Sequence, residues 1–345
     1  MGLPNIKALS LASLEQWLIT HDIKPYRANQ ILKWIYKYHA DSFHVMTDIS
    51  MPLRQKLADN FCIMSPTIAK IQLSVDGSKK YAFRLHDNHI IESVLIPERN
   101  HYTLCISSQV GCAQGCKFCL TAKQGLIRNL SYDEIVSQVQ MVMRDIMPEQ
   151  SMPLTNIVFM GMGEPLANYD HVKAAINILI NSKYGYQFSS RKITLSTCGI
   201  VPKMVSLSQE LPVLLAVSLN AADNETRSHL MPVNRKYPIE CILDTCRNYP
   251  LRSGRMITIE YVLIKNVNDA TTNAVRLSQL LRGIRSKINL IPYNAHIKSN
   301  FERPDESTIE AFQKTLIKNN YTVMIRQSKG SDISAACGQL MSELR

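Results

Sequence analysis

The sequence of residues 111–119 is Gly-Cys-Ala-Gln-Gly-Cys-Lys-Phe-Cys, a run that holds three of the nine cysteines of the chain. Its cysteines, Cys112, Cys116 and Cys119, follow the spacing C-x3-C-x2-C, and no fourth cysteine lies close by in the sequence. A structural zinc site takes four protein ligands, whereas a cubane iron–sulfur cluster takes a thiolate on each of its four irons. Three thiolates therefore predict a [4Fe–4S] cluster with one iron open to another ligand. The alternative is a zinc knuckle that a distant residue completes.

The C-x3-C-x2-C spacing resembles the signature of the radical S-adenosylmethionine (SAM) enzymes. The resemblance implies that SAM binds the open iron through its amino and carboxylate groups. It also implies that one electron from the cluster cleaves SAM and releases a 5′-deoxyadenosyl radical. Phe118, just before the third cysteine, is expected to shield the cluster from water, because a dry environment helps to set its potential.

Candidate strands and helical patterns alternate from about residue 98, which predicts a parallel sheet with outer helices. With about six such units the sheet is expected to curl into a partial (β/α)6 barrel, the architecture of the radical SAM enzymes. The chemistry of such a barrel lies at the C-terminal ends of its strands. Ser131 and Glu134 form a capping box at one helix start. The expected strands are Leu104–Ser107, Asn156–Met160, Lys192–Ser196, Val213–Leu219, Met256–Ile264, Lys287–Ile291 and Thr322–Arg326.

Two smaller units are expected to precede the radical SAM core, which covers residues 98–345. Apolar residues at helical spacing predict a helical accessory domain over residues 1–62. Alternating apolar residues around Asp76-Gly77 predict a β extension, or linker, over residues 63–97. One helix of the accessory domain has a basic outer face with interleaved aromatic residues, and this face is expected to contact RNA. Its residues are Arg27, Lys33, Trp34, Lys37 and Tyr38.

The composition and net charge of the chain indicate which partners and which compartment to expect. The chain has 345 residues and a formal net charge of +11, and a basic surface of this size attracts polyanions, with nucleic acid the leading candidate. The alternative is a basic protein that is merely soluble. No signal peptide and no apolar run long enough to cross a bilayer is visible. The scattered cysteines do not form a disulfide framework. We therefore expect a cytoplasmic protein.

Polar residues at the expected strand ends are candidates for binding SAM. Residues 159–166, Phe-Met-Gly-Met-Gly-Glu-Pro-Leu, resemble the GGEP-type motif of the superfamily, whose backbone and acid contact the amino group of SAM. Its two glycines allow the backbone to approach a ligand closely. The alternatives are a tight strand–helix turn for this motif and helix caps for the other strand ends. The predicted SAM-binding residues are Gly163, Glu164, Ser196, Ser218, Leu219, Asn220 and Asn294.

Three segments together resemble the RlmN/Cfr family of RNA adenine methyltransferases, and the resemblance covers nearly the whole chain. The segments are residues 103–112, Thr-Leu-Cys-Ile-Ser-Ser-Gln-Val-Gly-Cys, residues 160–166, and residues 332–340, Asp-Ile-Ser-Ala-Ala-Cys-Gly-Gln-Leu. Asn220 stands where many members have histidine, and Cys198 stands where serine is common. Neither departure involves the cysteines that the resemblance makes catalytic.

Within this family, Pro165, residues 289–292 and residues 91–97 favour the members that methylate carbon 2 of adenine. The other branch, Cfr, methylates carbon 8 and remains an alternative. A third possibility, from a different class, is a non-catalytic RNA-binding protein with a structural metal site.

The resemblance implies roles for two further cysteines and a glutamate. Cys337 would take a methyl group from one SAM, and the radical from a second SAM would remove a hydrogen from it. The resulting carbon radical would add to the adenine ring. Glu92 would accept the ring proton, and Cys105 would attack the Cys337 sulfur, which releases methylated RNA and leaves a transient disulfide. Arg326 and Lys329 lie near Cys337 in sequence and could favour its thiolate.

The resemblance also implies the partners. The substrates would be an adenosine in the peptidyl-transferase centre of 23S rRNA and adenosine 37 of certain tRNAs. An external electron donor of the flavodoxin type would reduce the cluster, and we expect a monomer with no membrane partner. Chemistry on a base edge requires an unstacked or flipped nucleotide. Phosphates are expected to contact basic residues near the cluster loop, namely Arg99, Lys117, Lys123 and Arg128.

Overall fold

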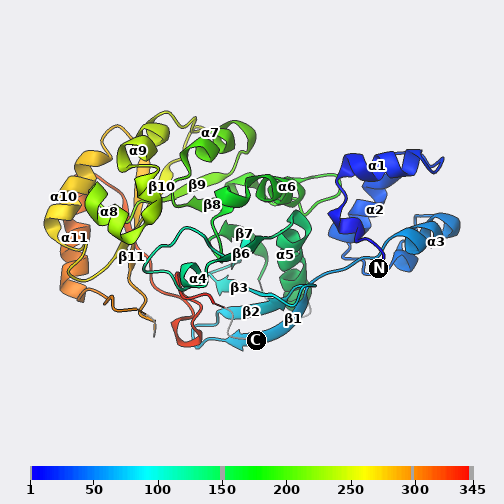
Figure 1. Cartoon of the computed structure of the whole chain (residues 1–345), viewed down its shortest axis with the longest axis horizontal. Coiled ribbons are helices and arrows are strands. Elements are labelled where there is room, and N and C mark those ends of the chain that lie inside the picture. The colour runs from blue at the N-terminus through cyan, green and yellow to red at the C-terminus, as the bar shows by residue number, and fades with distance from the viewer. Residues whose placement is uncertain (1, 148–151, 297–298, 342–345) are drawn as a thin grey trace.

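The computed structural model describes residues 2–147, 152–296 and 299–341. Its centre is one sheet with the strand order β1-β2-β3-β4-β7-β8-β9-β10-β11-β12. Strands β4 to β12 of this sheet pair in parallel, with helices between them, and form an open partial barrel (Figure 1). The fold is the one expected of a radical SAM core.

The elements have the following bounds. The strands are β1 Thr67–Leu73, β2 Lys79–Arg84, β3 Ile90–Pro97, β4 Tyr102–Cys105, β5 Gln109–Gly111, β6 Leu126–Asn129, β7 Leu154–Phe159, β8 Ile193–Thr197, β9 Leu214–Ser218, β10 Ile257–Leu263, β11 Ser286–Pro292 and β12 Val323–Ile325. The helices are α1 Leu11–Ile19, α2 Arg27–Tyr36, α3 Met51–Asn60, α4 Leu120–Lys123, α5 Tyr132–Ile146, α6 Tyr169–Ile180, α7 Val201–Glu210, α8 Asn224–Leu230, α9 Ile239–Arg247, α10 Thr271–Leu280 and α11 Glu306–Lys318.

The parallel strands lie within a residue or two of the positions that the sequence predicts. Their apolar runs are buried by helices, which is why the runs are nearly continuous rather than alternating. Strands β5 and β6 form a separate two-stranded sheet that the sequence analysis does not predict. These strands are three and four residues long, and so short a run carries too little pattern to be recognised.

The β extension continues the barrel sheet. Its first two strands are joined by the predicted turn, in which Gly77 has a φ of +84° and donates a backbone hydrogen bond to Ser74. Strand β3 pairs antiparallel with β4, the first barrel strand, with Val94 opposite Cys105. The proposed domain boundary after residue 97 therefore lies inside one continuous sheet, and the division of the chain into 1–62, 63–97 and 98–345 remains a prediction.

Helices α1, α2 and α3 form a small unit beside the barrel, at the blue end of the chain in Figure 1. Polar contacts attach this unit to α5. The buried ammonium of Lys7 donates to Ser137 and Gln140, and Gln140 donates in turn to the carbonyl oxygen of Ile35. Burial lowers the pKa of Lys7 to about 8. No helix in the described part of the chain is long and apolar enough to cross a bilayer.

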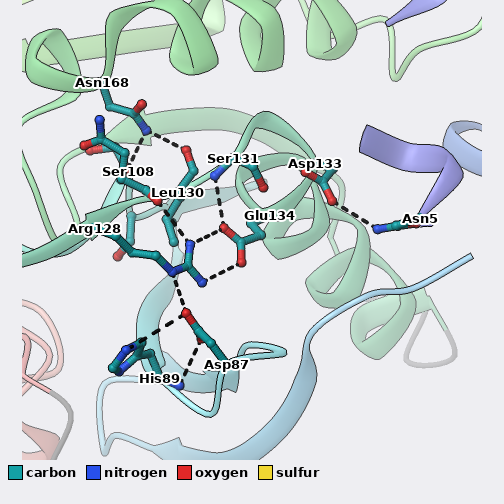
Figure 2. A network of polar contacts seen from close by, with 12 residues as sticks. Asn5, Asp87, His89, Ser108, Arg128, Leu130, Ser131, Asp133, Glu134 and Asn168 are labelled. Carbon is teal, nitrogen blue, oxygen red and sulfur yellow. Dashed lines mark hydrogen bonds and ion pairs between the residues drawn. The ribbon is translucent and has the colours of Figure 1, made fainter. Parts of the chain in front are cut away.

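Arg128 on β6 connects three parts of the core, as Figure 2 shows. Its guanidinium donates to Asp87, in the turn between β2 and β3, at 2.5 Å, and to both oxygens of Glu134 at 2.7 and 2.8 Å. Glu134 also accepts from the backbone N–H of Ser131, which confirms the predicted capping box. Two carboxylates already pair with Arg128, so its charge is largely compensated within the protein, and a contact between Arg128 and RNA phosphate remains a prediction.

Candidate active site

The cysteine loop leaves β5, passes through the short helix α4 and returns along β6. Its ends are held close together, because the backbone N–H of Cys112 donates to the carbonyl oxygen of Gly125 at 2.9 Å. A Cβ atom at Gly111 would lie 1.8 Å from that same oxygen, so only glycine fits where the loop begins. Cys112, Cys116 and Cys119 all line one cavity at the C-terminal ends of the barrel strands. We call it the cysteine cavity.

The three thiols lie close enough to affect one another. Burial, followed by the neighbouring Cys119, raises the pKa of Cys112 to about 12. Burial and the other two cysteines also raise the pKa of Cys116. Among the residues that the structure describes, no group of three or more His, Cys, Asp or Glu side chains is arranged to hold a single metal ion. Three thiols around one cavity fit the donor set of an iron–sulfur cluster, which binds thiolates.

Most of the predicted SAM-binding residues line the cysteine cavity. They come from the ends of successive strands, as parallel strands in a barrel require. Leu219 is the exception, because its side chain is fully buried and it is not part of the cavity lining. Its backbone donates to the carbonyl oxygen of Glu260 and accepts from Arg227. The predicted residues in the lining are Gly163, Glu164, Ser196, Ser218, Asn220 and Asn294.

Glu164 is buried at the exit of β7. Its carboxylate accepts from the backbone N–H of Cys198 at 2.8 Å and from that of Leu166 at 3.0 Å. Burial raises the pKa of Glu164, although these hydrogen bonds oppose the shift. Gly163 before it has a φ of +100°, and a Cβ there would lie 2.5 Å from the side chain of Gln109. The tight backbone thus holds an acidic group against the cavity.

Asn220 has a left-handed backbone, with a φ of +59°, at the end of β9. Its side-chain oxygen accepts from the backbone N–H of Val262, and its amide nitrogen faces the sulfur of Met231 at 3.2 Å. Asn294 donates to the carbonyl oxygen of Cys337 and is hydrogen-bonded to Ser328. Both asparagines therefore also hold neighbouring chain segments in place around the cavity.

Cys105 and Cys337 line a second cavity, which we call the paired-cysteine cavity. It shares Met160, Asn294 and Cys337 with the cysteine cavity, so the two adjoin. Cys105 is buried on β4, whereas Cys337 is exposed, and both are free thiols. Burial, and then the nearby Cys337, raises the pKa of Cys105 to about 12, while Arg326 opposes this shift. The structure thus brings together two cysteines from opposite ends of the core.

Glu92 lies on β3, two residues before Val94, which lines the paired-cysteine cavity. Residues two apart on a strand face the same side of a sheet, so Glu92 is on the cavity side. Its carboxylate is buried, lies 3.3 Å from the ammonium of Lys80 and accepts from the backbone N–H of Met341 at 3.0 Å.

The comparisons with known proteins agree with this geometry. Residues 4–63 match the model of the ribosomal RNA large subunit methyltransferase N-terminal domain, and residues 106–277 match that of the radical SAM superfamily. A relative from Desulfosudis oleivorans, named dual-specificity RNA methyltransferase RlmN, is 53% identical over 340 residues, which cover 99% of this chain and 91% of the relative. This chain belongs to the RlmN family.

Further similarities support the RlmN assignment. A relative of the same name from Geobacter sulfurreducens is 50% identical over 99% of this chain and 92% of its own. The crystal structure of a radical SAM methyltransferase from Sphaerobacter thermophilus has a TM-score of 0.91 and 41% identity, and covers 97% of this chain and 98% of that chain. The predicted family and the radical SAM fold are therefore confirmed, and the chain is a radical SAM RNA methyltransferase.

Two charged residues of this RlmN-family site are missing from the sequence predictions. Glu260 on β10 is buried in the lining of the cysteine cavity and accepts from the hydroxyl groups of Ser196 at 2.7 Å and Ser218 at 3.3 Å. One signal was available, since Glu260 is the one charged residue in a mostly apolar strand and carboxylates are seldom buried without partners. Arg227 on α8 is the second such residue.

Arg227 is fully buried behind the strand ends. It donates to the carbonyl oxygen of Leu219 at 3.0 Å, to that of Cys198 at 2.6 Å and to the side chain of Asn234 at 2.9 Å. Burial lowers the pKa of Arg227 to about 10. The sequence around it is polar and helical and gives no sign of burial, so only the tertiary structure reveals its role in joining the loops after β8 and β9.

The remaining basic candidates lie on the surface. Arg99, Lys117 and Lys123 are exposed, as contacts with phosphate require. Lys117 and Lys123 line an open cavity together with Cys116 and His229, and the Lys117 ammonium lies 3.3 Å from a ring nitrogen of His229. The surface next to the cysteine loop is therefore positively charged.

Proposed function

We propose that this RlmN-family chain methylates carbon 2 of adenosine in 23S rRNA and at position 37 of tRNA, with SAM as the methyl source. The name shared by its relatives, dual-specificity RNA methyltransferase, supports two RNA substrates. The observation that carries the proposal is the position of Cys105 and Cys337 on one cavity, directly beside the cavity that the three loop cysteines line.

In this proposal Cys112, Cys116 and Cys119 hold one [4Fe–4S] cluster, which when bound supplies the electron that cleaves SAM to a 5′-deoxyadenosyl radical. The polar strand ends orient SAM, with Glu164 as the acceptor for its amino group. Among the predicted SAM residues, Leu219 would contribute through its backbone between Ser218 and Asn220, because its side chain is in the core. An external, flavodoxin-type electron donor and a monomeric state belong to the same proposal.

A methyl carrier on the protein is required by the chemistry of the base. Carbon 2 of adenine is electron-poor and cannot attack the methyl group of SAM as a nucleophile. Cys337 is exposed and also lines the cysteine cavity, the proposed SAM site, which supports its role as the nucleophile that takes a methyl group from SAM by displacement. The 5′-deoxyadenosyl radical would take one hydrogen atom from this methyl group, so that a methylene group joins the ring. Once the adduct has given up one electron, which would return to the cluster, Glu92 accepts the proton that leaves carbon 2.

Cys105 then resolves the covalent adduct in our proposal. Its thiol is protonated at neutral pH, since its pKa is about 12, and it must lose that proton to attack the Cys337 sulfur. Arg326 lines the same cavity and favours the thiolate. The attack forms a disulfide between Cys105 and Cys337 and breaks the bond from the Cys337 sulfur to the bridging methylene carbon. That carbon takes up a proton and becomes the methyl group of the released base, and an external reductant must restore the two thiols.

The helical unit is the proposed docking surface for RNA. Tyr26 and Tyr38 are about half exposed, the guanidinium of Arg27 lies 5.1 Å from the Tyr26 ring centroid, and the Lys33 ammonium lies 5.4 Å from that of Tyr38. Aromatic faces beside cations suit unstacked bases and phosphates together. Trp34 packs edge-on against Tyr38 and extends this surface.

Anaerobic reconstitution with iron, sulfide and SAM, followed by incubation with tRNA or a 23S rRNA fragment, tests the proposal. Mass spectrometry of the digested RNA should show 2-methyladenosine, and a Cys116→Ala variant should give none. A product of 8-methyladenosine would instead support the Cfr-like alternative. A colourless zinc protein without any RNA product would support the non-catalytic alternative.

A further inference from the structure

The segment that carries Cys337 contacts the turn of the β extension through two carboxylates. Asp332 accepts from the hydroxyl of Ser74 at 2.5 Å and from the backbone N–H of Val75 at 3.1 Å. In the opposite direction, Asp76 accepts from the backbone N–H of Gly330 at 2.9 Å. The Cys337 segment and the hairpin turn thus each supply one carboxylate that accepts hydrogen bonds from the other. We call these contacts the hairpin latch, and residues 330–341 the Cys337 segment.

The hairpin side of the latch is itself well ordered. Asp76 also accepts from the backbone N–H of Ser78 at 2.9 Å, and Ser74 donates its own N–H to the carbonyl oxygen of Ser78 at 2.8 Å. Burial of Asp76 is outweighed by its hydrogen bonds from Gly330 and Ser78, and its pKa falls to about 2. The carboxylate of Asp76 is therefore charged at neutral pH, where it can accept the hydrogen bond from Gly330.

The residues between the latch and Cys337 have a well-defined backbone conformation. Gly330 and Ser334 are both left-handed, with φ values of +66° and +52°, and the turn between them is closed by a hydrogen bond from Ala335 to Gly330 at 2.8 Å. A Cβ at Gly330 would lie 2.7 Å from that of Ala335. Ala335 and Ala336 are buried, so the chain is held in place up to the residue before Cys337.

A second set of contacts holds the far side of the Cys337 segment. The backbone N–H of Leu120 donates to Gly338 at 2.7 Å, and the hydroxyl of Thr121 donates to Leu340 at 2.6 Å. Both donors belong to α4, the short helix within the cysteine loop, directly after Cys119. In Figure 1 the red end of the chain lies between this helix and the strands β1 and β2. The residues before Cys337 are thus held by the hairpin, and the residues after it are held by the cysteine loop.

We propose that the hairpin latch positions the methyl-carrying cysteine, so that Asp332, Ser74 and Asp76 are positioning residues for the transfer of the methyl group to Cys337. The β extension then has a specific task, since its turn is one of the two anchors between which the reactive sulfur is held. This inference rests on the proposed role of Cys337, whereas the latch itself can be tested without any catalysis.

Asp332→Ala is the direct test, because Asp332 contacts the hairpin and takes no part in the hairpin's own turn. In the anaerobic, cluster-containing protein, amide hydrogen exchange over residues 330–341 should become faster by roughly fivefold, because hydrogen bonds to an exposed carboxylate contribute only modestly to stability. Asp332→Asn keeps one acceptor oxygen and should give an intermediate rate. The matched control is Asp87→Ala, which breaks a carboxylate contact at the other turn of the same extension and should leave this exchange unchanged.

A second measurement tests whether the latch positions Cys337 for methyl transfer. Methyl loading of Cys337, followed by mass spectrometry of its peptide, should slow by roughly fivefold in Asp332→Ala while the dissociation constant of SAM stays unchanged. Unchanged hydrogen exchange in this variant would overturn the latch. Faster exchange with normal loading would overturn the positioning role. If Cys337 in the unaltered protein never acquires a methyl group, the proposed function fails, and the exchange data separate that outcome from a failure of the latch.

Discussion

Lys80 and Glu92 form a buried ion pair, in which the Lys80 ammonium lies 3.3 Å from a carboxylate oxygen and the two side chains are 7% and 6% exposed. The same ammonium donates to the carbonyl oxygen of Ser334 at 3.3 Å. Lys80 therefore joins the proposed proton acceptor to the segment that carries Cys337. The ion pair is thus a second contact between the β extension and the Cys337 segment, in addition to the hairpin latch.

Replacing Lys80 by methionine should be strongly destabilising. It removes the buried cation that lies 3.3 Å from the Glu92 carboxylate, and breaking a buried pair in this way typically costs about 3–5 kcal/mol. Lys80→Arg should retain most of the stability. Urea unfolding followed by circular dichroism measures the difference, and a loss below about 1 kcal/mol would show that the pair is solvated in solution.

Cys105 should react slowly with iodoacetamide at neutral pH, because burial holds its thiol protonated up to a pKa of about 12. Its rate should rise about tenfold per pH unit between pH 7 and 10, since the thiolate fraction grows by that factor below the pKa. Peptide mass spectrometry can follow the modification, with exposed Cys241 as an internal reference. A rate that levels off before pH 10 would contradict the raised pKa.

The same shift predicts a loss of stability in alkali. The folded pKa is above that of an unfolded cysteine, so the contribution of Cys105 is complete below about pH 9 and is lost as the pH rises towards 12. The free energy of unfolding of the reduced protein should fall in this window, and less steeply in Cys105→Ala. Equal slopes for the two proteins would argue against burial of this thiol.

Substitution of the two paired cysteines should arrest the reaction at different stages. Cys337→Ala removes the proposed carrier and should give neither methyl transfer nor adduct. Cys105→Ala should still load the methyl group and attach RNA covalently through Cys337, because the resolving thiol is missing. A denaturing gel of each variant after turnover distinguishes them. The assigned roles are wrong if RNA-linked protein is absent from Cys105→Ala or equally abundant in both.

Glu164→Ala should weaken SAM binding by roughly tenfold or more, as expected for a charge-assisted hydrogen bond. It should also lower stability, because the backbone N–H groups of Leu166 and Cys198 lose their acceptor. Cys198→Ser is the matched control, since it keeps the backbone N–H that donates to Glu164 and replaces the thiol, which faces Gln114 and Glu164, by a hydroxyl that can donate in its place. Equilibrium binding of SAM to the cluster-containing protein measures both, and identical constants would exclude Glu164 from the site.

The basic face of α2 should contribute to RNA affinity in a salt-dependent way. Replacing Lys33 and Lys37 by alanine should reduce the slope of log affinity against log salt by about 1.5, because two phosphate contacts are lost. The control is a pair of lysines with the same spacing on α11, Lys314 and Lys318, which are both exposed, whereas Lys33 is half-buried and Lys37 is exposed. Filter binding of tRNA at several salt concentrations would disprove the docking surface if both double variants behaved alike.

Local sequence patterns were sufficient for much of the fold and part of the site. Continuous apolar runs marked the parallel strands, and Asp76-Gly77 marked the hairpin turn, because these signals lie within a few neighbouring residues. The spacing of Cys112, Cys116 and Cys119 also predicted one shared site, since a short loop keeps its own side chains together. Leu219 shows the limit of such local patterns. It stands between two polar residues at a strand end, and this position does not tell whether its side chain faces the cavity or the core.

The tertiary structure decided every relationship between residues that are distant in the sequence. Asp332 and Ser74 are 258 positions apart, and only the return of the chain to the sheet edge brings them into contact. Cys105 and Cys337 line one cavity for the same reason, and Glu92 contacts the Cys337 segment through the backbone of Met341. Arg227 likewise acquires its partners through three separate loops. Pairings of this kind depend on strand order and register, which are set by the packing of the whole core. The sequence alone determined the elements and the chemistry of the loop, whereas the folded chain determined which side chains meet.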